Sequence, residues 1–152
     1  MFPYQRPRRL RKSQAIRDLV QETRLHPSDF IVPLFIVEGQ NIKEEISSMP
    51  NYFRMSLDKV EQEVKDLWAM GLKSVLLFVK VDDSQKDNTG KAAIDDNGLM
   101  QNAIKTIKNA VPEMYIMTDV ALDPYSIVGH DGIVENGKII NDQSVEMLAK
   151  MA

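Results

Sequence analysis

Three near-continuous apolar runs constrain the fold of this chain more than any other feature of its sequence. They read "FIVPLFIVEG" at residues 30–39, "KSVLLFVKV" at 73–81 and "MYIMTDVA" at 114–121. Apolar runs of this length, without strict alternation, are typical of strands that are buried on both faces. Pro33 has no N–H to donate to a sheet ladder, so it predicts an edge position or a bulge in the first run.

Amphipathic segments separate the three runs. Apolar residues recur with a helical period between Ser56 and Gly71, where the glycine ends the helix, and again over residues 99–111. Residues 40–55 show no such period and are predicted to form a loop. The resulting order of strand, helix, strand, helix and strand indicates a parallel α/β sheet. In such sheets the loops that follow the carboxyl ends of the strands carry the chemistry.

The N-terminal residues predict an arm rather than a part of the sheet. The stretch "MFPYQRPRRLRK" has no apolar period, and we expect it to be extended. Its basic side chains are those of Arg6, Arg8, Arg9, Arg11 and Lys12. A basic arm can bind nucleic acid or phosphate, but the net charge of -3 favours an arm that packs on another subunit. Ser13 is placed to cap a short helix that follows the arm. We assign residues 1–28, the arm and this helix, to subunit contacts, and residues 29–152 to the first βα units of a truncated fold.

The C-terminal residues predict a hairpin and then a helix with no strand after it. Residues 135–137 suit a tight turn, and Asn141 or Asp142 is expected to cap the helix that follows. An amphipathic helix in an α/β sheet normally leads into another strand, but the sequence stops at Ala152. We therefore expect the chain to be truncated within its fold.

An acidic segment, "TDVALDPYSIVGHDG", begins where the third apolar run ends. It contains Asp119, Asp123 and Asp131, and no lysine or arginine lies within it. Carboxylates this close repel one another unless a cation or a shared proton joins them. His130 in the same segment is a candidate ligand or acid/base group, with a hydrogen-bonded structural histidine as the alternative. The pattern favours a carboxylate site over a solvated turn.

A second polar loop, "DDSQKDNTGKAA", follows the second apolar run and is expected at the same edge of the sheet. Lys86 and Asp87 are its candidate substrate-contacting residues, in a loop long enough to act as a lid. No phosphate-binding glycine motif, metalloprotease motif or serine nucleophile elbow is present in the sequence. Two classes of function remain: an α/β enzyme that uses carboxylates or a metal, and a receiver-like regulatory module that binds Mg²⁺ at strand-end aspartates.

The composition excludes several other classes. With no cysteine in the sequence, thiolate metal sites, disulfides and cysteine nucleophiles are impossible. The longest apolar run is too short to span a bilayer, and the N-terminus lacks the pattern of a signal peptide. We therefore expect a cytoplasmic protein with neither a membrane nor a nucleic acid as its partner.

Several segments together resemble porphobilinogen synthase (5-aminolaevulinate dehydratase). They are "RPRRLRKS", "IRDLVQETRLHPSDFIVPLFIVEG", "SMPNYFRMSLDKV", "KDNTGKAA", "GLMQNAIKTIKNAVPEMYIMTDVALDPY" and "GHDGIVENGKIIND", in the order and spacing of that family. The resemblance covers the chain from the arm to Ala152 and corresponds to roughly the N-terminal half of the enzyme. It implies the first part of a (β/α)8 barrel with an N-terminal arm, and a homo-octamer. It also implies a lyase that condenses two 5-aminolaevulinate molecules to porphobilinogen, the precursor of haem and chlorophyll.

The resemblance also implies roles for the acidic residues. In zinc-dependent members of the family, three cysteines occupy the positions of Ala121, Asp123 and Asp131, so this chain resembles the cysteine-free, aspartate-rich branch. Carboxylates favour Mg²⁺ or a monovalent cation, whereas thiolates favour zinc, and an active-site zinc is not expected here. Asp119 is implied to lie near the reacting amino group. Val128 stands where the family often has a histidine.

The resemblance places the covalent chemistry elsewhere in the family's sequence. Two lysines of the second half form Schiff bases with the two substrates, and no lysine of this chain lies in either motif. We therefore expect residues 1–152 to be inactive by themselves. Arg6, Arg8, Arg9 and Arg11 are implied to serve assembly.

Overall fold

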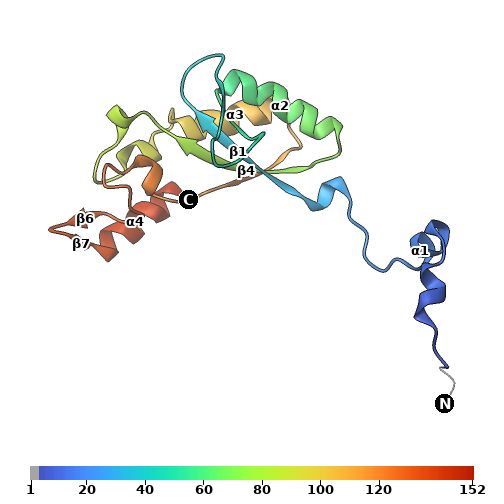
Figure 1. Cartoon of the computed structure of the whole chain (residues 1–152). Helices are drawn as coiled ribbons and strands as arrows, with labels where there is room; N and C mark the ends of the chain where they lie inside the picture. The colour runs from blue at the N-terminus through green and yellow to red at the C-terminus, as the bar shows by residue number, and fades with distance from the viewer. Residues whose placement is uncertain (1–3) are drawn as a thin grey trace.

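A mostly parallel five-stranded sheet organises the structure, a computed structural model that describes residues 4–152. The strands lie in the order β2 (Lys43–Glu45), β3 (Phe53–Met55), β1 (Ile31–Val37), β4 (Ser74–Lys80) and β5 (Tyr115–Thr118). Strands β3, β1, β4 and β5 are parallel, and β2 runs antiparallel to β3. The prediction of a parallel α/β sheet is confirmed (Figure 1).

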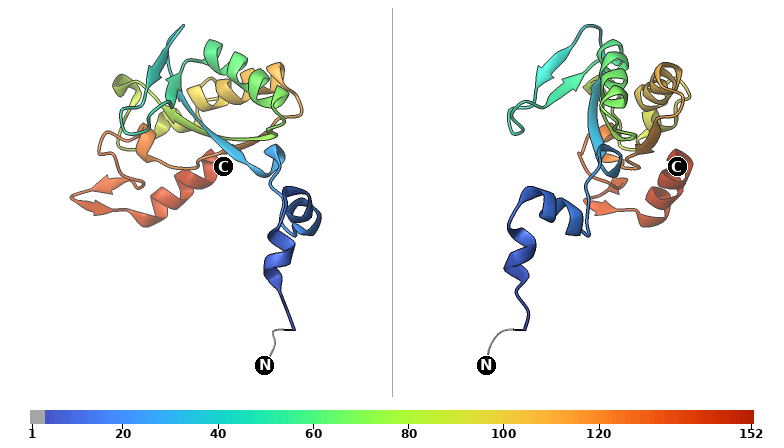
Figure 2. Two further views of the ribbon diagram at one scale, coloured as in Figure 1. Left: turned by 45° about the vertical axis from the view of Figure 1, so that its right-hand side comes forward. Right: turned by 90° about the vertical axis from the view of Figure 1, so that its right-hand side faces the viewer.

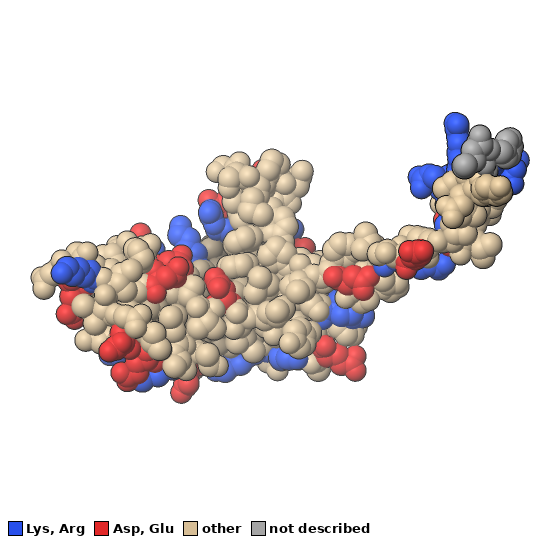
Figure 3. All heavy atoms as spheres, turned by 90° about the horizontal axis from the view of Figure 1, so that it is seen from below, with Lys and Arg blue, Asp and Glu red and all other residues tan. Residues whose placement is uncertain are grey.

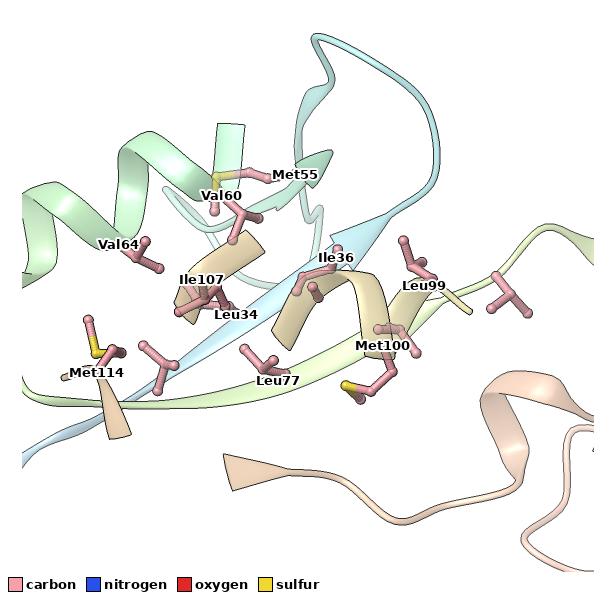
Figure 4. Close-up of a cluster of buried hydrophobic side chains, with 14 of the residues drawn as sticks. Leu34, Ile36, Met55, Val60, Val64, Leu77, Leu99, Met100, Ile107 and Met114 are labelled. Atoms are coloured by element: carbon pink, nitrogen blue, oxygen red, sulfur yellow. The ribbon is translucent and has the colours of Figure 1, made fainter. Parts of the chain in front are cut away.

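Helices α2 (Leu57–Ala69) and α3 (Leu99–Ala110) cover one face of this sheet. Figure 4 shows side chains from β1, β4 and both helices converging there. The most deeply buried members are Ile36, Val60, Val64, Val75, Leu77, Ile107 and Met114. Because Leu34 pairs with Leu77 in the register of β1 and β4, both side chains point to this core. Burial of this apolar face supplies most of the drive to fold.

The prediction that all three strands are buried on both faces is wrong for the described residues. Phe35 and Phe78, which stack with their ring centroids 5.2 Å apart, lie on the face away from the helices and are only half-buried. Strand β5 is more exposed still, with Tyr115 62% and Met117 38% accessible. It pairs with β4 on one side, and among residues 4–152 no strand pairs with its other side.

The prediction of a loop over residues 40–55 is also wrong, because β2 and β3 lie within it. Each strand has three residues, too few for a period to show in the sequence. Strand β3 forms by pairing with the second half of β1, at Phe35 and Ile36. The first half of β1 is therefore an edge on that side, which is where Pro33 lies and where its carbonyl accepts a hydrogen bond from Tyr52 Oη. The expected edge position of Pro33 is confirmed.

Two of the three helix-end residues predicted from the sequence, Gly71 and Ser13, are confirmed. Gly71 ends α2 at φ 93°, a conformation that favours glycine, and its N–H donates to the Trp68 carbonyl. Ser13 Oγ caps α1 (Gln14–Val20) by accepting from the Ile16 N–H at 3.3 Å. Neither Asn141 nor Asp142 caps α4 (Asn141–Met151), contrary to prediction.

The N-cap of α4 is instead Ile140, which has no side chain able to cap. Its carbonyl accepts from Ser144 Oγ at 2.7 Å, and its N–H donates to the Ile133 carbonyl. The hairpin before it, β6 (Val134–Glu135) and β7 (Lys138–Ile139), turns through Asn136 and Gly137 at φ 51° and 73°. These positive φ values are those of the predicted tight turn.

The N-terminal arm projects away from the sheet in every view (Figures 1 and 2). Residues Pro7–Arg11 form a short 3₁₀ helix, so the expectation of a fully extended arm is wrong at this point. Residues 1–3 lie outside the described part of the chain, and the division at residue 28 stays a prediction. Within the described residues, no helix is both long and apolar enough to cross a membrane.

Candidate functional site

The loops that follow β1, β4 and β5 meet at the carboxyl edge of the sheet. Glu38 directly follows β1, and its Oε1 accepts from Gln85 Nε2 of the loop after β4 at 2.6 Å. A cavity of about 670 Å³ opens here, lined in part by Glu38, Gln85, Asp87 and Lys91. Neither Glu38 nor Gln85 was predicted from the sequence, although the position of Glu38 directly after a strand is a usable signal.

Asp123 and Asp131 are brought together, as the acidic segment predicted. Asp123 begins a short 3₁₀ turn, Asp123–Tyr125, and its backbone N–H donates to Asp131 Oδ1 at 3.4 Å. Partial burial, then the charge and hydrogen bonding of Asp131, then the charge of Asp119, raise the pKa of Asp123 above its ordinary value. A proton or a cation between these carboxyls relieves the repulsion.

Asp119 lies one residue beyond β5, with its N–H donating to the Leu77 carbonyl at 3.3 Å. Burial first, and the charge of Asp119 second, raise the pKa of Tyr125 to about 12. Tyr125 therefore stays a neutral phenol at physiological pH and keeps its proton. Asp123 lies within electrostatic reach of both Asp119 and Asp131.

The donor set limits which metal could bind. Among residues 4–152, no group of three or more His, Cys, Asp or Glu side chains is arranged to hold an ion. Asp123 and Asp131 offer oxygen ligands that suit a hard, partly hydrated cation. The thiolate and imidazole ligands that zinc prefers are not gathered there.

Lys86 and Asp87 occupy the predicted loop after β4, but each already has partners within it. Lys86 Nζ forms an ion pair with Asp83 at 2.8 Å. Asp87 Oδ1 accepts from the Thr89 N–H at 2.6 Å, Thr89 Oγ1 at 2.9 Å and the Gly90 N–H at 2.6 Å. Burial alone would raise the pKa of Asp87, but the bonds from Thr89, Lys91 and Gly90 outweigh it and lower that pKa.

His130 is exposed and lies one residue before Asp131, on the outer part of its loop. Within the described chain, no hydrogen bond or ion pair engages its ring. Val128, which stands where the resembled family often has a histidine, is 50% accessible on the same loop. The roles predicted for His130, Lys86 and Asp87 stay predictions.

Replacing Asp131 by asparagine is expected to stabilise the metal-free protein at neutral pH, by on the order of 0.5 kcal/mol after screening by water. The raised pKa of Asp123 means that folding disfavours its ionised form. Its contribution to stability is therefore present below the ordinary Asp pKa and lost as pH rises through the raised value. Asparagine keeps an acceptor for the Asp123 N–H and removes the charge.

Urea unfolding across a pH series, with a chelator present, measures this effect. The variant's advantage should disappear as the pH falls through the raised pKa of Asp123. Asp142→Asn, an exposed aspartate at the start of α4, is the control and should show no such pH dependence. An Asp131→Asn variant no more stable than the wild type at neutral pH would contradict the electrostatic account.

This chain is similar in sequence to proteins of one enzyme family. A family model described as delta-aminolevulinic acid dehydratase matches residues 4–152. The delta-aminolevulinic acid dehydratase of Chlamydia pneumoniae is 46% identical over 147 residues, which covers 97% of this chain and 44% of that protein. The Bacillus subtilis (strain 168) enzyme of the same name is 46% identical over 149 residues, covering 98% of this chain and 45% of its own length.

A solved structure shares the fold. The delta-aminolevulinic acid dehydratase (porphobilinogen synthase) of Toxoplasma gondii ME49, in complex with its reaction product porphobilinogen, superposes with a TM-score of 0.90 at 42% identity. The match covers 99% of this chain and 44% of that one. This chain thus spans less than half the length of the relatives it matches.

Proposed function

The chain belongs to the delta-aminolevulinic acid dehydratase (porphobilinogen synthase) family, and on that premise we propose that it serves a lyase that condenses two 5-aminolaevulinate molecules to porphobilinogen. The observation that carries the proposal is the fold match, over 99% of the chain, to an enzyme that holds porphobilinogen. The acidic segment lies at the carboxyl edge of the sheet, where barrel enzymes carry their chemistry. Because the chain matches this enzyme family, we no longer propose the alternative of a receiver-like regulatory module.

Each acidic residue has a proposed role in that reaction. Asp119, one residue beyond β5, would hydrogen-bond the reacting amino group of a substrate and take or return its proton. Asp123 and Asp131 would hold a Mg²⁺ ion or a monovalent cation, which when bound supplies positive charge beside the reacting centre. Tyr125 keeps its proton and remains a hydrogen-bond donor.

The loop after β4 is proposed to close the rim on the substrate. Asp87 lines the cavity together with Glu38 and Gln85, while its Oδ1 shapes its own loop. Lys86 precedes Asp87 on the loop after β4, and His130 precedes Asp131 on the loop after β5. We propose that both approach the substrate carboxylates when these loops close.

The direct test is incubation of the native protein, as expressed from its own gene, with 5-aminolaevulinate. We expect porphobilinogen, identified by its mass and by its colour reaction with an aldehyde reagent, to accumulate at a rate proportional to enzyme concentration. Heat-denatured protein is the control. Absence of porphobilinogen above this control, under any combination of Mg²⁺ and potassium, would refute the proposed function.

Residues 1–152 expressed alone are expected to form no porphobilinogen. The two lysines to which the family's Schiff-base chemistry is assigned have no counterpart among the lysines of this chain. Lys86, which is partly buried on the loop after β4, is held in an ion pair with Asp83 at 2.8 Å. Detectable turnover by the purified 152-residue polypeptide would contradict this assignment of roles.

We further propose that the arm packs on another copy of the chain, within a homo-oligomer for which the family resemblance suggests eight subunits. Among residues 4–28, three leucines are largely exposed: Leu10 is 51%, Leu19 82% and Leu25 77% accessible. Figure 3 shows basic side chains gathered near the end of this projecting arm. The cytoplasmic location and the lack of a nucleic-acid partner also stay proposals, the latter supported by a net charge of -3.

Deletion of residues 1–12 from the native protein is expected to lower its oligomeric state. The arm projects from the sheet, so its apolar side chains are buried when the arm packs on another copy, and the deletion removes those contacts. Light scattering coupled to size-exclusion chromatography gives the mass. A glycine–serine stretch of equal length in place of residues 1–12 separates the effect of sequence from that of length. An unchanged mass for both variants would contradict the role of the arm.

A further inference from the structure

The segment at residues 127–133, here named the Asp131 segment, is tied to the loop after β4 at both of its ends. At its first end, the Asp87 N–H donates to the Tyr125 carbonyl at 3.1 Å, and the Ile127 N–H donates to the Asp87 carbonyl at 3.2 Å. These two bonds form an isolated parallel bridge between Asp87 and Ser126. The first end is therefore held by backbone alone.

The second end is held by one side chain. Asn88 Nδ2 donates to the Val134 carbonyl at 2.8 Å, and Asn88 Oδ1 accepts from the Val134 N–H at 3.3 Å. A carboxamide that bonds both backbone groups of a single residue fixes that residue in position and orientation. Residues 87 and 88 thus hold both ends of the Asp131 segment from one adjacent pair of positions.

Hydrogen bonds and close packing join the hairpin, α4 and the residues beside Val134. Ser144 Oγ accepts from the Ile133 N–H at 2.9 Å and donates to the Ile140 carbonyl at 2.7 Å. Gly132 is packed so closely that a Cβ there would lie 2.7 Å from Ile139 Cγ2. Helix α4 also packs against residues Lys91–Ile94 of the loop after β4, and Asn88 adds a side-chain hydrogen-bonded link between this unit and that loop.

Between its two ends the Asp131 segment is weakly held. Residues 127–131 are all exposed. Asp131 Oδ1 accepts from the Asp123 N–H at 3.4 Å, near the upper limit for a hydrogen bond, and the two carboxyls bond each other against their mutual repulsion. A contact this weak does not fix the segment, so the position of Asp131 depends on the two ends.

We propose that Asn88 is a positioning residue, whose amide holds Asp131 beside Asp123 by fixing the end of the segment that carries it. We call the two hydrogen bonds between Asn88 and Val134 the clamp. Only the turnover readout rests on the proposed function, because the clamp itself concerns the contact between the two loops. Asn88 touches neither carboxylate, and it acts through Val134.

Asn88→Ala tests the clamp in the native protein. Amide hydrogen exchange followed by mass spectrometry should show the Asp131 segment exchanging at least roughly fivefold faster, because both bonds to Val134 are lost. The matched control is Asn102→Ala, which removes a similar carboxamide bond, from Nδ2 to the Asn97 carbonyl at 2.7 Å, away from the acidic segment. It should leave exchange of the Asp131 segment unchanged.

If Asn88→Ala fails to fold, Asn88→Asp replaces it. Aspartate keeps the size of the side chain and an acceptor for the Val134 N–H but loses the donor to the Val134 carbonyl. Exchange of the Asp131 segment should again increase.

A double-mutant cycle separates positioning from mere stabilisation. Asn88→Ala should lower kcat roughly tenfold in the wild-type background and have almost no further effect in an Asp131→Ala background. Asn102→Ala should leave kcat unchanged in both. Non-additivity of this kind arises only when Asn88 acts through Asp131.

The outcomes are distinguishable. Unchanged exchange of the Asp131 segment in Asn88→Ala would overturn the clamp, and an equal loss of kcat in both backgrounds would overturn the positioning role. Faster exchange in a protein whose wild type makes no porphobilinogen would support the clamp and count against the proposed function alone.

Discussion

Asp119→Asn lowers the kcat for porphobilinogen formation by roughly 10²- to 10⁴-fold, the usual range for loss of a positioned acid/base group. Asparagine keeps the size of the side chain and removes the carboxylate that would take a proton from the substrate's amino group. Because the Asp119 N–H bonds the Leu77 carbonyl through the backbone, the substitution leaves that contact intact. Initial rates at saturating substrate, together with thermal unfolding, measure the two quantities that must be separated.

Asp66→Asn is the control for this substitution, since Asp66 is exposed on α2, away from the carboxyl edge. It should change neither kcat nor the melting temperature. An Asp119→Asn variant that retains more than about a tenth of wild-type kcat would remove Asp119 from the acid/base role.

The triple variant Ala121→Cys, Asp123→Cys and Asp131→Cys binds zinc at least about a thousandfold more tightly than the wild type. Thiolates are the ligands that zinc prefers, and the family resemblance implies cysteines at these three positions in zinc-dependent members. The wild type presents carboxylates at two of them, and its described residues gather no set of three ligands. Competition against a chromophoric zinc chelator gives the affinity.

The matched control replaces the same three residues by serine, which has the size of cysteine but no thiolate. Its zinc affinity should equal or fall below that of the wild type. Equal zinc affinities for the cysteine and serine variants would mean that the three positions do not converge, and the metal role of Asp123 and Asp131 would be wrong.

Local signals in the sequence account for the part of the fold that was predicted correctly. Helices α2 and α3 and strands β1 and β4 have the periods and end residues that their structures require, down to Gly71 at positive φ. The errors in the strands share one cause, which is dependence on distant neighbours. Strand β3 pairs with β1 on one side and with β2 on the other, and among the described residues no strand pairs with the outer edge of β5.

The candidate site divides in the same way. The convergence of Asp119, Asp123 and Asp131 was predictable, since they are close in sequence and follow a strand end. The clamp between Asn88 and Val134 was not predictable, because it joins residues 46 apart through a single polar side chain. Such a contact leaves no period, run or motif in the sequence. The partners of Asp87 within its own loop were equally invisible, although its position was predicted.

The most direct test of the central claim is the response of porphobilinogen formation to Mg²⁺ in the native protein and in an Asp123→Ala, Asp131→Ala double variant. Both are freed of metal with a chelator and titrated in parallel. If the two aspartates hold a hard cation beside the reacting centre, Mg²⁺ raises the wild-type rate, zinc does not replace it, and the double variant fails to respond. A double variant with the full Mg²⁺ response of the wild type would contradict the account.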